Sequence, residues 1–283
     1  MDTKKLFQLV ALDLDGTLLN SDGCVSEENK AAIKKATQQG IVFAIATGRP
    51  YCGLPLETME ELGIQYAITA NGAAIYQAPE KNCLFEHCMP ASLVSSILEK
   101  LLKLEIHMDI FTHGDAYTPA KCRKTLRNIH SLPSSLKQYI LTTREVVPDI
   151  MAFLQKGQPP IQKLTLNFQK KEDGSYIDRE ETIQTLNQYP GVTYLSGGYG
   201  NLEFTKNGVT KAKGLSLLCN YLGIPIEQSI ACGDSENDLD IIKAAGLGVA
   251  MANAPKDICS QADDVTLSND MHGVAAMLEK HLQ

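Results

Sequence analysis

The sequence contains no long apolar run, no CxxC cysteine pair and no excess of positive charge, and each absence argues against a class of protein. No segment approaches the ~18 consecutive apolar residues that a membrane-spanning helix needs. The eight cysteines are scattered, without a CxxC pair or a histidine cluster beside them, so no zinc site is indicated and reduced thiols are expected. The formal net charge of −7 gives a nucleic-acid partner no electrostatic attraction.

The composition that is present is typical of a soluble globular protein. Apolar residues make up 44% and charged residues 21% of 283 residues, a length that favours two domains with sizeable cores. Residues 1–5 (MDTKK) lack the apolar region of a signal peptide, and we therefore expect a cytoplasmic protein without membrane contact. There are no internal repeats, and no feature indicates a particular oligomeric state.

The chain is organised around the segment Asp13–Leu18 (DLDGTL), which directly follows the apolar run Leu9–Leu12. That run predicts a buried strand that ends in two carboxylates and a glycine. In an open parallel sheet, ligands bind at the carboxyl ends of strands, so this strand end is a candidate site. The alternative is an ordinary polar turn, because Asp and Gly are common turn residues.

The segments on either side of the middle of the chain predict one parallel α/β core. Helices at 26–39 and 55–62 alternate with apolar strands at 41–46 and 66–69, and Asn71-Gly72 predicts a hairpin. The same alternation of apolar strands and helices resumes near the end of the chain. Its predicted elements are a helix at 211–222, strands at 229–232, 247–251 and 263–266, a helix at 236–245 and a last helix reaching 282.

Between these halves the pattern changes to alternating, half-exposed strands such as 162–168. This predicts an inserted α+β domain with helices on one face of its sheet. Its helices are expected at 90–103, 121–129, 145–155 and 178–188, and the glycine-rich segment Ser196–Gly200 is interpreted as the hinge back to the core. The predicted fold is a Rossmann-like parallel-sheet core with helices on both faces (1–82 and 201–283), interrupted by a cap domain (83–200).

Two further polar clusters follow predicted core strands, and a third lies at a helix start. Thr47–Arg49 follows the strand at 41–46, and Gly233–Asp238 (GDSEND) follows the strand at 229–232. Lys211 and Lys213 begin a helix, where anions are normally favoured over cations, and a bound anion would account for them. The alternative is two solvated lysines and an acid-rich helix cap.

Together these clusters resemble the four motifs of the haloacid dehalogenase superfamily. Asp13–Thr17 resembles the first motif, Thr47–Arg49 the second, Lys211 the third and Gly233–Asp238 the fourth. The order and the position of the insertion resemble the Cof-like branch of sugar-phosphate and cofactor phosphatases. The third motif departs locally, because family members often have Lys-Gly there and residues 211–214 (KAKG) offer two lysines, of which Lys213 precedes the glycine. Lys211 is preferred for its spacing to residues 222–224, and Lys213 is the alternative.

The resemblance implies a magnesium-dependent phosphatase that works through an aspartyl-phosphate. Asp13 is expected to be the nucleophile and Asp15 the general acid and base. Mg²⁺ is expected on the carboxylates of Asp13 and Asp234 and the backbone carbonyl of Asp15. This would offset the repulsion between a carboxylate and a phosphate dianion, about 4 kcal/mol per charge pair at ~4 Å and ε ~20. Asp238 is expected to orient Lys211 or a metal-bound water rather than bind the metal directly.

The remaining expectations concern the substrate. Its phosphate oxygens are expected to be held by Thr47, Gly48, Lys211 and Asn237. Three candidate substrate contacts are Arg49, Asn71 and Gly72. The substrate is expected to be a small phosphate ester, and sugar phosphates, pyridoxal phosphate and flavin-related phosphates all stay open. A sugar-phosphate mutase and a non-catalytic binding module are the alternative functions, although a binding module has no use for Asp15.

Overall fold

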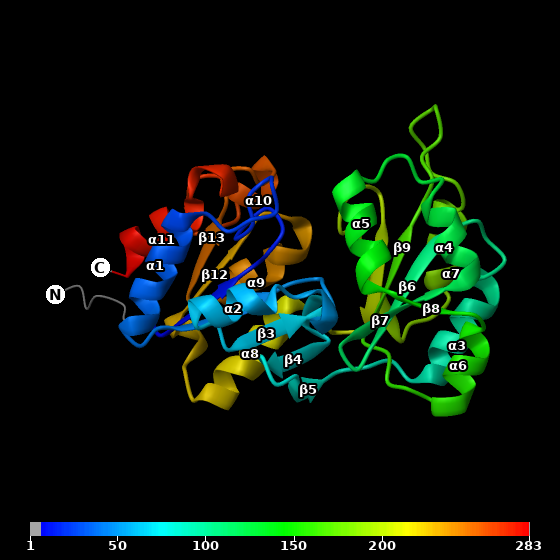
Figure 1. Cartoon of the computed structure of the whole chain (residues 1–283), viewed down its shortest axis with the longest axis horizontal. Coiled ribbons are helices and arrows are strands. Elements are labelled where there is room, and N and C mark those ends of the chain that lie inside the picture. The colour runs from blue at the N-terminus through cyan, green and yellow to red at the C-terminus, as the bar shows by residue number, and fades with distance from the viewer. Residues whose placement is uncertain (1–6, 283) are drawn as a thin grey trace. The chain divides into compact units, whose positions relative to one another are not determined.

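The computed structural model describes residues 7–282 and divides them into two compact units (Figure 1). The first unit comprises the described residues up to Gly48, Leu54–Phe85 and the described residues from Thr210 onward. The second comprises Arg49–Gly53 and Glu86–Val209. Residues 1–5, which lack the apolar region of a signal peptide, lie outside the described residues. Within 7–282, no helix is long and apolar enough to cross a membrane.

The first unit is built on an eight-stranded sheet with the order β14-β13-β12-β1-β2-β3-β4-β5. The neighbours from β14 to β3 run parallel, and β4 returns antiparallel to β3 through the predicted turn at Asn71-Gly72. The strands are β1 Leu9–Leu12, β2 Val42–Ala46, β3 Tyr66–Thr69, β4 Ala74–Gln77, β5 Asn82–Glu86, β12 Ser229–Gly233, β13 Leu247–Ala250 and β14 Asp264–Val265.

Helices cover both faces of this sheet, because its central strands are apolar on both sides (Figure 1). On one face Leu9 and Ala11 pack in a cluster with Leu215 and Leu218. Side-chain caps define the helix starts: Ser26 Oγ accepts from the Asn29 N–H, and Thr210 accepts from the Lys213 N–H. The helices are α1 Glu27–Gln38, α2 Leu56–Leu62, α8 Lys211–Leu222, α9 Leu239–Ala244, α10 Lys256–Cys259 and α11 Gly273–His281.

The second unit contains a six-stranded, mostly antiparallel sheet with the order β10-β11-β9-β6-β7-β8. Its strands are β6 His107–Thr112, β7 Asp115–Pro119, β8 Glu145–Val147, β9 Lys163–Asn167, β10 Val192–Leu195 and β11 Leu202–Lys206. Its helices are α3 Ala91–Leu101, α4 Ala120–Leu126, α5 Ser134–Thr143, α6 Ile150–Gly157 and α7 Arg179–Leu186. The predicted α/β core with an inserted α+β cap is therefore confirmed.

Alternation along the cap strands separates an apolar face from a polar one. Apolar residues of β6, β9 and β11 pack with α3, α6 and α7 in one core cluster. The alternate positions carry charged partners: Arg144 Nε lies 3.2 Å from Asp109, and Lys163 Nζ lies 2.8 Å from Glu203. His107 pairs through Nδ1 with Asn167 at 3.0 Å, and burial lowers the pKa of this histidine. The polar positions of this sheet are thus occupied by ion pairs and hydrogen bonds.

The predicted boundaries of the cap need correction. Ser196–Gly200 is not the hinge to the core, because it joins β10 to β11, and β11 pairs with β9 inside the cap sheet. The division falls instead between Val209 and Thr210, and the first one between Phe85 and Glu86. The helix expected at 145–155 is a short strand, β8, followed by α6.

Candidate active site

The carboxyl ends of three neighbouring strands bring the predicted motifs to one edge of the core sheet. Asp13 follows β1, Thr47 follows β2 and Asp234 follows β12, and these strands are parallel neighbours. The Asp13 N–H extends the ladder by donating to the Cys232 carbonyl at 3.0 Å, and the Thr47 N–H donates to the Ile68 carbonyl at 2.8 Å. The backbone at each strand end is therefore held by its neighbour.

Lys211, the first residue of α8, lies between two carboxylates. Its Nζ is 2.7 Å from Asp13 Oδ1 and 2.6 Å from Asp238 Oδ1, and the residue is 1% exposed. Lys213 is exposed on the same helix. The structure thus places Lys211, and not Lys213, beside Asp13.

Two glycines allow the start of α8 to approach the sheet. A Cβ on Gly214 would lie 2.4 Å from Ile68 Cγ2, and one on Gly72 would lie 2.1 Å from the Thr210 carbonyl oxygen. Any larger side chain at either position would push the first turn of α8 outward, and Lys211 with it.

The carboxylate of Asp238 is surrounded by donors. Its Oδ2 accepts from the Asp234 N–H, the Ser235 N–H and Ser235 Oγ, each at 3.1 Å, while Oδ1 accepts from Lys211. The bonds with Ser235 form a reciprocal capping box at this helix start. Asp238 is completely buried. Its geometry suits a residue that orients Lys211 and the turn around Asp234.

Asp234 has weaker and longer contacts. Thr17 Oγ1 donates to its Oδ1 at 3.4 Å, and Asn253 Nδ2 donates to its Oδ2 at 3.3 Å. The turn after Asp13 also packs against it, because a Cβ on Gly16 would lie 2.4 Å from Asp234 Oδ2. Gly16 has a φ of +83°, so this turn requires glycine for both its conformation and its space.

The site carries more negative than positive charge. Ligand atoms of Asp13, Asp234 and Asp238 lie within 4.8 Å of one another, and Lys211 is the cation paired with two of them. Burial and the neighbouring Asp238 raise the pKa of Asp13 well above its usual value, and they raise that of Asp234 to about 6. Burial alone would lower the pKa of Lys211, but Asp13 and Asp238 outweigh it and raise that pKa.

This donor set fits a divalent cation. Hard cations such as Mg²⁺ take carboxylate oxygens, and the excess charge of the cluster is of the right sign. Asp13 and Asp234 are the residues that could hold the ion, since the oxygens of Asp238 already accept from four donors.

A left-handed turn after β3 brings Asn71 to Asn237. Ala70, Asn71 and Gly72 all have positive φ, and the Asn71 N–H donates to the Thr47 carbonyl at 3.1 Å. Asn237 Nδ2 donates to Asn71 Oδ1 at 3.3 Å, while Asn237 Oδ1 accepts from Ser235 Oγ at 2.7 Å. The two amides thus link the ends of β2, β3 and β12.

Two further predicted residues follow the ends of β1 and β2. The Asp15 side chain is exposed on the turn after Asp13, where its backbone bridges to Leu19. Arg49 groups with the second unit, although it follows Gly48 directly. There it donates to the Gly53 carbonyl at 3.1 Å, and its guanidinium carbon lies 4.7 Å from the centre of the Tyr139 ring.

Sequence reasoning gave no role to Thr17, Ser235 or Asn253, each of which contacts the cluster. Asn253 follows β13, so a polar residue just beyond a neighbouring strand was the available signal.

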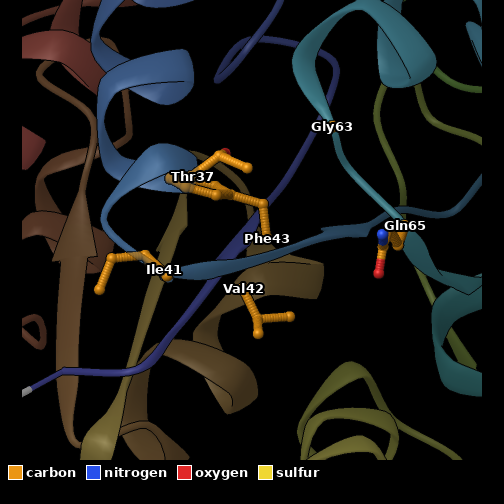
Figure 2. Close-up of a pocket in the computed structure, with 7 residues that line it drawn as sticks. Thr37, Ile41, Val42, Phe43, Gly63 and Gln65 are labelled. Carbon is orange, nitrogen blue, oxygen red and sulfur yellow. The ribbon is translucent and has the colours of Figure 1, made fainter.

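A hollow of about 130 Å³ lies at the opposite end of the strands (Figure 2). Val42 and Gln65, which line it, stand at the amino ends of β2 and β3. Its lining includes none of the site residues, and in open α/β sheets ligands bind at the carboxyl ends. This hollow is therefore separate from the candidate active site.

Comparisons with known proteins find relatives over almost the whole chain. A model of haloacid dehalogenase-like hydrolases matches residues 10–278. Phosphatase YwpJ of Bacillus subtilis is 34% identical over 287 residues, covering 97% of this chain and 99% of that protein. The 5-amino-6-(5-phospho-D-ribitylamino)uracil phosphatase YwtE of the same organism is 27% identical, covering 96% and 97%. The solved structure of a haloacid dehalogenase-like hydrolase from B. subtilis is 32% identical with a TM-score of 0.82, covering 98% and 100%.

These findings show the class of hydrolase to which the protein belongs. The chain belongs to the haloacid dehalogenase-like hydrolase family. Within that family it is a phosphatase, as the resemblance of its motifs predicts.

Proposed function

We propose that this protein is a magnesium-dependent phosphatase that hydrolyses a small cytosolic phosphate monoester through an aspartyl-phosphate on Asp13. The observation that supports this most directly is the position of Lys211, whose ammonium pairs with Asp13 at 2.7 Å beside a cluster rich in carboxylates. Lys211 favours the ionised form of Asp13, and only that form is a nucleophile. The same ammonium is then available to a phosphate oxygen.

Mg²⁺ would be held by the carboxylates of Asp13 and Asp234 and by the backbone carbonyl of Asp15. When bound, it would offset the repulsion between Asp13 and a phosphate dianion and the charge that develops during transfer. The buried Asp238 would keep Lys211 pointed at Asp13 through the contact at 2.6 Å. The oxygens of Asp238 already accept four hydrogen bonds, which supports an orienting role for this residue rather than metal binding.

The other residues would bind the phosphate and move protons. Asp15, exposed on its turn, would protonate the leaving oxygen and then take a proton from the attacking water. The phosphate oxygens would be held by Thr47, the Gly48 N–H, Lys211 and Asn237. Asn71, 3.3 Å from Asn237, and Gly72 would border this site, and Arg49 is a further candidate substrate contact.

The names of the relatives support one substrate class. Three curated relatives that cover most of this chain are 5-amino-6-(5-phospho-D-ribitylamino)uracil phosphatases, which act on a phosphorylated ribityl compound. A sugar or sugar-alcohol phosphate, free or attached to a cofactor precursor, is therefore the class we propose. The cap would select the leaving group, as lids over phosphate sites do.

The test is a panel of phosphate esters ranked by kcat/KM with Mg²⁺ and without any bisphosphate activator. Hydrolysis of one substrate with release of inorganic phosphate is expected, and exhaustive chelation should abolish it until Mg²⁺ is restored. A requirement for a bisphosphate would indicate a mutase instead. Full activity after chelation would overturn the metal assignment, and no turnover on any ester would favour a binding module.

A further inference from the structure

Asn253 joins the two segments that carry the proposed metal ligands. It follows β13 at the carboxyl edge of the core sheet. Its Nδ2 donates to the Gly16 carbonyl at 2.8 Å and to Asp234 Oδ2 at 3.3 Å. One side chain thus spans the turn after Asp13 and the turn after β12, which belong to opposite ends of the sequence.

The orientation of this amide is determined by its neighbours. The Asn269 N–H donates to Asn253 Oδ1 at 3.0 Å, and a backbone N–H can only donate. The amide nitrogen must therefore face the Gly16 carbonyl, which can only accept, and from there it also contacts Asp234 Oδ2. Asn269 is itself anchored, because its Nδ2 donates to the Leu19 carbonyl at 3.0 Å. The network has one consistent arrangement of donors.

These contacts define the plane of the Asp234 carboxylate. Thr17 Oγ1 contacts one oxygen and Asn253 the other, so rotation about the carboxyl bond would break both contacts. The same amide holds the carbonyl of Gly16, the residue after Asp15. Because the amide is neutral, it orients these groups without changing the charge of the cluster, in which carboxylates outnumber cations.

We propose that Asn253 is a positioning residue for cation binding, which holds Asp234 and the Asp15–Gly16 turn in the geometry that a divalent ion requires. This inference rests on the proposed function, since it needs Mg²⁺ at Asp13 and Asp234. Partners of metal ligands commonly contribute 10- to 100-fold to affinity. Asn253 is exposed, so water can replace part of its contribution, and about a tenfold effect is expected.

The experiment measures Mg²⁺ binding directly by calorimetry on the full chain, together with thermal melting with and without Mg²⁺. Asn253→Ala removes both donated bonds, and its Kd for Mg²⁺ should rise about tenfold. Asn269→Ala is the matched control: it loses the bond to Leu19 but keeps the backbone N–H that Asn253 accepts. This control should melt at a lower temperature without Mg²⁺, while its Kd stays within about twofold of the wild-type value.

An unchanged Kd in folded Asn253→Ala would overturn the inference, as would an equal weakening in Asn269→Ala, because that would indicate a general loss of structure. Asn253→Ser, which is too short to reach the Gly16 carbonyl, replaces the alanine variant if that one does not fold. Asp234→Asn should lose most of the Mg²⁺ affinity in the same assay. A wild-type protein that binds no Mg²⁺ would refute the metal assignment in the proposed function together with this inference, whereas an effect missing only in the Asn253 variants refutes the inference alone.

Discussion

Replacing Lys211 by methionine tests the central charge of the site with little change in side-chain volume. Lys211 is 1% exposed and contacts Asp13 at 2.7 Å and Asp238 at 2.6 Å. The variant leaves two buried carboxylates without their cation, which typically costs 3–5 kcal/mol of stability, so about 4 kcal/mol is expected. Removing one donor that stabilises transition-state charge lowers kcat by roughly 10²–10³. Both effects should therefore be large.

The pKa of Asp13 determines in which direction the pH dependence should change in Lys211→Met. Lys211 lowers the pKa of Asp13 against the effects of burial and Asp238, so its loss raises that pKa further. The acid limb of the kcat–pH profile should consequently move to higher pH in Lys211→Met. A carboxyl whose pKa is higher in the folded than in the unfolded state contributes stability at low pH, and this contribution is lost as pH rises through the folded pKa. The variant should therefore be less destabilised relative to wild type at pH 5 than at pH 8.

The assay combines urea unfolding at two pH values with initial rates on 4-nitrophenyl phosphate, and Lys213→Met serves as the matched control. Lys213 is exposed in the same first turn of α8, so its variant should keep nearly all activity and stability. A fully folded Lys211→Met enzyme within about tenfold of the wild-type kcat would refute the reasoning. A larger loss in Lys213→Met would show that the third motif has been assigned to the wrong lysine.

Three other perturbations address the acid, the carboxylates and the packing. Asp15→Asn should lose much more activity on a sugar phosphate than on the nitrophenyl ester, whose leaving group needs little protonation. Mass spectrometry of the Asp15→Asn variant after acid quench should find phosphate on Asp13, because the attacking water of the second step lacks its base. For the metal-free protein, the pKa of Asp234, raised to about 6, and the raised pKa of Asp13 predict that the free energy of unfolding falls as pH rises from about 4 past 6. Asp234 contributes on the order of 3 kcal/mol, and added Mg²⁺ should reverse the trend. Gly214→Ala should lower stability by about 1–3 kcal/mol and reduce kcat, because the new Cβ meets Ile68. Gly157→Ala, whose nearest neighbour would be 3.7 Å away, should leave both nearly unchanged.

The core fold was predictable because each of its central strands is buried on both faces. Residues 9–12 and 42–46 therefore appear in the sequence as continuous apolar runs, and their lengths and spacing indicate parallel strands. Because such strands end at one edge, the polar residues that follow them were expected to meet. Asp13, Lys211 and Asp238 do so within hydrogen-bonding distance.

The limits of the cap were not predictable from local chemistry. A glycine-rich segment such as Ser196–Gly200 suits either a hinge or a hairpin turn, since both need the same backbone freedom. The choice depends on the pairing of Leu202 with Leu166, two residues far apart in the sequence. The helix α5 was missed for a related reason: it buries mainly Ile140, so its apolar periodicity is weak.

Hydrogen-bond lengths distinguish the roles of the acids better than the sequence does. Asp238 accepts four bonds of 2.6–3.1 Å, three of them from the turn that it caps, so its charge is used within the fold. Asp234 accepts only longer bonds of 3.3–3.4 Å from Thr17 and Asn253. Contacts of this length are weak, so they leave much of the carboxylate's capacity to accept available. Burial also raises the pKa of Asp234 to about 6, so an ion beside it would stabilise its charged form, and we therefore propose Asp234 together with Asp13 as the ligands of a divalent cation.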